Sequence, residues 1–205
     1  VILFLVGTIP AVIMSAAFLS AYSDQSLVRL GNDVSNQCQI LATQMSSANY
    51  LDNPNNETLT GELMQLATLY DGRILIIDRN FHVIEDTYAL EEGRTMVAEE
   101  VIKCFKGEST SHYVSGRFIE MTVPIVETVS AQNATEDMPE GTEIVRGVML
   151  TSVSTDSIVM TMEILNRKAQ IVEIIMVFCI FALALVLAQV LIRPFDRVSK
   201  AIGEV

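Results

Sequence analysis

The chain has 205 residues, half of them hydrophobic, and its mean hydropathy of +0.40 excludes an ordinary soluble domain. Its net charge of −12 disfavours nucleic acid as a partner, because an acidic surface repels phosphate. Its three cysteines, Cys38, Cys104 and Cys179, are too few for a disulfide-framed scaffold.

The first segment, residues 1–22, carries no charged residue and predicts a membrane-spanning helix. No methionine or basic flank precedes Val1, so we expect the printed sequence to begin inside this span. A cleaved signal peptide is the alternative, with Ser20 and Ala21 as small residues near a cleavage site.

The next segment repeats apolar residues at helical spacing and predicts that the membrane helix continues outward. The apolar stripe consists of Leu27, Leu30, Val34, Cys38, Leu41 and Met45. We expect this stripe to face a second copy of the chain in a homodimer. The turn-forming residues 52–56 end the helix.

The middle of the chain alternates helix and strand signals. We expect a short helix from Glu57 to Leu69, and then a hairpin of strands 73–78 and 81–86 joined at Arg79-Asn80. A helix from Met96 to Phe105 follows, and Lys106-Gly107 ends it. Three further strands are predicted at Ser111–Val114, Arg117–Val129 and Ile144–Ser152, with an acidic loop at 130–142.

The last segment predicts one long helix that starts at Ser154 or Thr155, either of which can cap it. From Ile174 to Ile192 there is no charged residue, and about 28 Å of helix is enough to cross a bilayer core. Beyond the span, apolar residues recur in a heptad pattern, which is typical of helices that pack against each other. The residues expected to transmit a signal are Arg193, Pro194, Phe195, Val198, Ile202 and Val205.

These segments define four parts: membrane helix 1–22, a domain 23–168, membrane helix 169–192 and a C-terminal segment 193–205, which begins a further helix. The domain 23–168 has 22 Asp and Glu against 10 Lys and Arg, whereas residues 193–205 have three basic against two acidic residues. The positive-inside rule therefore places the domain outside and the C-terminal segment in the cytoplasm. Cys38 and Cys104 both fall in the outer domain, either as a disulfide or as two buried free thiols.

The order of elements resembles single-Cache (PAS-like) extracytoplasmic sensor domains, and Arg193-Pro194 with its heptad seam resembles the start of a HAMP linker. The resemblance implies an α+β fold: a five-stranded antiparallel sheet with a long N-terminal helix, flanked by two transmembrane helices. It also implies a two-pass protein of a bacterial plasma membrane, the receptor half of a sensor histidine kinase. Such a kinase would pass its signal to a response regulator through domains that follow Val205.

In the domains that this chain resembles, small anions are often held by an arginine near the central strands. We therefore expect Arg117, beside His112 and Tyr113, to anchor an anionic ligand, with Arg73 and Tyr88 as weaker candidates. The alternative is that these are strand residues that face water. The sequence offers no metal-ligand spacing, no catalytic motif and no cofactor motif.

Several functions remain compatible with this organisation. The first is the receptor half of a two-component sensor histidine kinase. A chemoreceptor or a cyclic-dinucleotide enzyme has the same features, because its output domain also lies downstream. A non-signalling two-span subunit of a transporter or envelope complex is the alternative from another class, although it has no need of a heptad seam at the membrane exit.

Overall fold

The computed structural model describes residues 2–108, 111–114, 117–129 and 139–202, and the chain divides into two compact units. One unit is Leu27–Ser157, and the other combines Val1–Ser26 with Ile158–Val205. The elements are, in chain order, α1 (Ile2–Ser47), α2 (Glu57–Leu69), β1 (Gly72–Asp78), β2 (Val83–Asp86), α3 (Glu99–Phe105), β3 (Ser111–Val114), β4 (Phe118–Thr128), β5 (Glu143–Ser154) and α4 (Asp156–Ile202).

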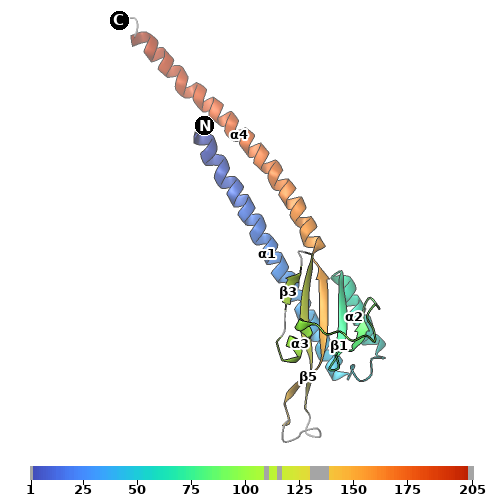
Figure 1. Ribbon diagram of the computed structural model, residues 1–205. Helices are drawn as coiled ribbons and strands as arrows, with labels where there is room; N and C mark the ends of the chain where they lie inside the picture. Colours follow the sequence, from blue (N-terminus) through green and yellow to red (C-terminus); the bar gives the residue numbers. More distant parts are fainter. Residues whose placement is uncertain (1, 109–110, 115–116, 130–138, 203–205) are drawn as a thin grey trace. The chain divides into compact units, whose positions relative to one another are not determined.

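The unit Leu27–Ser157 is built on an antiparallel sheet with the strand order β2-β1-β5-β4-β3 (Figure 1). The second half of α1 and all of α2 cover one face, where a core forms around residues such as Met45, Leu63 and Ile76. On the other face α3 covers a smaller core that includes Leu75, Val101 and Val148. The predicted α+β class, the antiparallel sheet and the long N-terminal helix are confirmed.

The last strand along the chain, β5, lies in the centre of the sheet. It pairs with β1 from Gly72↔Val153 to Asp78↔Gly147, and with β4 from Phe118↔Ser154 to Thr128↔Glu143. Gly147 is required here because an added Cβ would lie 2.9 Å from the Ile77 carbonyl oxygen. Among the described strands, β5 is therefore the one that joins the two halves of the sheet.

Two predicted boundaries are wrong. The β1–β2 connection is longer than the predicted two-residue turn because Asp78 Oδ1 accepts hydrogen bonds from the amides of Asn80 and His82, each at 2.8 Å. In addition, α3 begins at Glu99 and not at Met96, because the Met96 amide donates to the Phe81 carbonyl oxygen at 2.8 Å. Ala98 then has an extended backbone as the N-cap of α3.

In the unit made of Val1–Ser26 and Ile158–Val205, the residues that the structure describes are all helical. Within the described residues, one helix is long and apolar enough to cross a membrane: the stretch Asp156–Leu187 of α4, none of which is buried. At Gly7 of α1, an added Cβ would lie 3.0 Å from Cδ1 of Ile180 in α4, so the two helices approach closely there. The side chains of residues 1–6 and 8 lie outside the described residues, and the first span stays a prediction.

Candidate functional site: the junction between the sheet and the last helix

A single residue separates the central strand from the last helix. β5 ends at Ser154 and α4 begins at Asp156, so Thr155 alone connects them. Ser154 Oγ accepts a hydrogen bond from the Asp156 amide at 3.2 Å, which satisfies one of the free amides at the helix start. The predicted helix start is therefore correct to within two residues, and one residue links it to the sheet.

Two backbone hydrogen bonds fix this junction to distant parts of the chain. The Ser154 amide donates to the Asp71 carbonyl oxygen at 3.2 Å, and the Thr155 amide donates to the Arg117 carbonyl oxygen at 2.8 Å. Asp71 precedes β1 and has φ of +46°, which is uncommon for a residue other than glycine. The junction is therefore held by the α2–β1 turn on one side and by the residue before β4 on the other.

Close packing at Gly72 completes the junction. A Cβ on Gly72 would lie 2.7 Å from the Ser152 carbonyl oxygen and 3.3 Å from Val153 Cα. Thr155 is fully buried, and its hydroxyl has no hydrogen-bond partner among the described residues. A buried hydroxyl without a partner costs about 1–3 kcal/mol, so this residue is held in place by its surroundings.

The first predicted ligand site centres on Arg117. This residue is exposed, and its carbonyl oxygen forms the hydrogen bond with Thr155 described above. His112 and Tyr113 lie on β3 opposite Glu120 and Ile119 of β4, and their side chains lie outside the described residues. The predicted grouping of Arg117, His112 and Tyr113 therefore stays a prediction, but the position of Arg117 beside the start of α4 is established.

The second predicted pair, Arg73 and Tyr88, is brought together around a residue that the sequence analysis missed. Asp86 is fully buried and receives hydrogen bonds from Arg73 Nε at 2.9 Å and from Arg73 Nη2 at 2.6 Å. The Asp86 carboxylate also accepts hydrogen bonds from the amides of Tyr88, Leu90 and Glu91. Arg73 Cζ lies 5.8 Å from the centroid of the Tyr88 ring.

The electrostatics of this cluster follow from its geometry. Burial alone would raise the pKa of Asp86, but the hydrogen bonds from Arg73 and from the three amides outweigh it and hold the pKa well below its usual range. The charge of Arg73 is thus already neutralised by the Asp86 carboxylate, to which the guanidinium donates two hydrogen bonds. Asp86 occupies the Nε and Nη2 edge of the Arg73 guanidinium, and its five hydrogen bonds hold the loop after β2.

The predicted dimer stripe lies largely inside its own subunit. Val34, Cys38, Leu41 and Met45 are all buried in the core beneath the sheet, and Leu27 and Leu30 pack against that core. Cys38 Sγ lies 3.4 Å from Thr151 Oγ1 of β5. The prediction that this stripe faces a second copy is therefore wrong for the fully buried Val34, Cys38 and Met45, because the sheet already covers their apolar surface.

The two cysteines of this unit lie on opposite faces of the sheet. Cys38 belongs to the core under α1, and Cys104 to the core under α3. All three cysteines of the chain are free. Burial raises the pKa of both the Cys38 and the Cys104 thiol, which makes them poor nucleophiles. Of the two alternatives left open by the sequence, the free thiols are correct.

No protein-family model matches this chain, and no curated protein sequence is significantly similar to it. Among the described residues, no group of three or more His, Cys, Asp or Glu side chains is arranged to hold a metal ion. The predicted transmission residues lie in the last part of the chain: α4 continues through Arg193 and Pro194 to Ile202, where the side chains lie outside the described residues, as does Val205.

Proposed function

We propose that the chain is the receptor part of a homodimeric transmembrane signalling protein, with the sheet as a single-Cache-like sensor outside the cytoplasm. The observation that carries this proposal is the connection of β5 to α4 through Thr155 alone. A central strand that enters a 47-residue helix without a loop can pass a small displacement along that helix. A module that only binds partners has no use for such a connection.

The backbone contact between Thr155 and Arg117 supports a route from ligand to helix. An anion bound at Arg117 would act on the residue whose carbonyl oxygen holds the Thr155 amide. The ligand's effect is then a bias between two arrangements of α4, limited by its differential affinity for them.

We propose that the full protein is a sensor histidine kinase, with a HAMP linker after the membrane helix and a response regulator as the downstream partner. The alternatives are a chemoreceptor or a cyclic-dinucleotide enzyme.

The test changes the rotation of the downstream part of α4 about the helix axis. We would join residues 1–205 to the catalytic half of a sensor histidine kinase and insert residues between Ala169 and Gln170. One alanine turns everything downstream by about 100°, whereas a seven-residue helical insertion restores the face to within about 20°. We expect one alanine to change basal autophosphorylation by about fivefold or more, and seven residues to leave it within about twofold. Equal activity of both insertions would show that α4 is only a tether.

A further inference from the structure

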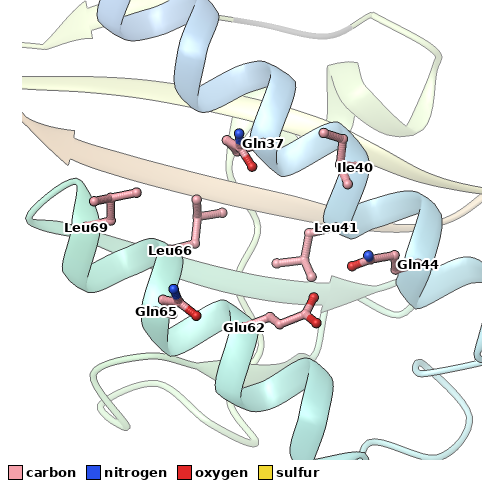
Figure 2. Close-up of a pocket in the computed structure, with 8 residues that line it drawn as sticks. All are labelled: Gln37, Ile40, Leu41, Gln44, Glu62, Gln65, Leu66 and Leu69. Atoms are coloured by element: carbon pink, nitrogen blue, oxygen red, sulfur yellow. The ribbon is translucent and has the colours of Figure 1, made fainter.

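A shallow groove lies between α1 and α2 on the outer side of the helix layer (Figure 2). Its volume is about 270 Å³. Leu41 of α1 and Leu66 of α2 are nearly buried and form its apolar floor. At its edges, Ile40 is 55% exposed and Leu69 is 70% exposed. An apolar floor beside two protruding apolar side chains is a surface that can complement a copy of itself.

The charge distribution sets this surface apart from the rest of the domain. From Val34 to Leu51 the sequence has no charged residue, although residues 23–168 hold 22 acidic against 10 basic side chains. Gln37 and Gln44 flank the groove on α1, and Glu62 is the one charged side chain among the residues that line it. Much of this uncharged segment is exposed, so core packing does not explain the absence of charge.

Electrostatics point to a particular occupant. Two copies of a domain with a net charge of −12 repel each other over most of their surfaces. They can approach with least repulsion where the surface is neutral, and a neutral surface gives no advantage in binding a basic or an acidic partner. A closed two-fold contact also requires that the same patch be used by both copies.

We infer that two copies of the chain meet across a two-fold axis through the α1–α2 groove, so that Ile40 or Leu69 of each copy packs on the floor of the other. This inference rests on the proposed function, which requires a dimer, and it names the surface that forms it. The surface shares only Leu41 with the predicted stripe, and its protruding residue Ile40 lies about 160° around α1 from the buried Cys38.

Disulfide trapping in the full-length chain tests the assignment. All variants carry Cys179→Ser, because Cys179 is exposed whereas Cys38 and Cys104 are buried. In this background Ile40→Cys, Leu69→Cys and a co-expressed mixture of both are oxidised in membranes with copper phenanthroline. Gln39→Cys is the matched control: it is exposed and uncharged, but lies about 100° away around the helix.

We expect at least one of the three groove samples to give about tenfold more covalent dimer than Gln39→Cys, because paired thiols in a complex have a high effective concentration. No dimer above the control in any groove sample would overturn the assignment, and so would equal trapping at Gln39→Cys. Because Ile40 and Leu69 are on the surface, these substitutions leave the core intact.

The mass of the detergent-solubilised chain, measured by light scattering, separates the two ways of failing. A dimer that is not trapped through the groove overturns this interface and leaves the proposed receptor standing. A monomer that is not trapped overturns both the groove assignment and the proposed homodimer. Trapping of the groove cysteines to a different protein overturns the groove assignment.

Discussion

At the scale of single residues, Asp86 is the centre of a buried hydrogen-bond cluster that the sequence did not indicate. Its carboxylate takes two hydrogen bonds from Arg73 and three from backbone amides, and it is fully buried. A buried carboxylate with this many donors is stabilising only while all of them are present. Removing its charge leaves Arg73, whose side chain is 24% exposed, without its counter-ion.

We expect Asp86→Asn to lower the free energy of unfolding by about 2–3 kcal/mol, because one buried partner of an ion pair is lost while the other is partly exposed. Urea unfolding in detergent, followed by tyrosine fluorescence, measures this. Arg94→Gln is the control: it breaks the exposed Arg94–Glu91 pair and should change stability by no more than about 0.5 kcal/mol. An equal effect of both substitutions would contradict the account of the cluster.

The stability of the wild type and of Asp86→Asn should depend differently on pH. The pKa of Asp86 is lower in the folded than in the unfolded chain, because its hydrogen bonds favour the charged form. Its contribution is therefore fully present above the unfolded pKa of about 3.9 and is lost as the pH falls below it toward the folded pKa. Between about pH 5 and pH 3 the wild type should lose more stability than Asp86→Asn, and parallel curves would refute the assignment.

At the scale of elements, local signals predicted the helices and strands well. The α2 boundaries, Glu57 and Leu69, match because Asn56 supplies a side-chain cap that the sequence makes visible. Periodicity also identified the buried face of α1, but it carries no information about what covers that face. Periodicity alone therefore predicts that the stripe containing Cys38 is a dimer surface. In the structure β5 covers it, although β5 lies more than 100 residues later in the sequence.

In the candidate site too, local features were predictable from the sequence and contacts between distant segments were not. The helix start at Ser154–Asp156 followed from capping residues, and Arg117 was singled out as a side chain. What the sequence could not reveal is strand order, and only strand order brings Arg117 and Asp71 to the two sides of Ser154 and Thr155. Asp86 was missed for a related reason: its approach to Arg73 depends on the β1–β2 register, in which Leu75 pairs with Asp86.

The two glycines Gly72 and Gly61 give an element-scale test of the junction. Gly72→Ala forces a Cβ against the Ser152 carbonyl oxygen of β5 and should destabilise the chain by about 2 kcal/mol. Gly61→Ala lies on the exposed side of α2, where nothing is within 4 Å, and should stabilise it by up to about 1 kcal/mol. Urea unfolding of both variants measures this, and a harmless Gly72→Ala would mean that β1 is not tightly seated at the junction.

At the scale of the whole molecule, the charges predict which side of the membrane each part occupies. Residues 23–168 are strongly acidic, whereas the segment after Arg193 is slightly basic. We expect a periplasmic reporter to be active when fused at Gly141, and a cytoplasmic reporter to be active when fused after Val205. A cytoplasmic reporter that is active at Gly141 would contradict the topology and the proposed receptor with it.

The central position of β5 also determines when the domain can fold during synthesis. Before residues 143–154 have been made, the other strands that the structure describes can form two separate pairs, β1–β2 and β3–β4. A two-stranded unit is marginally stable in water, so neither half has a lasting partner at that stage. The sheet closes when β5 emerges, and Thr155 and the first turn of α4 follow at once. In the proposed topology, the sensor therefore completes its fold only after its last strand has been made, and that strand directly precedes the helix that anchors it.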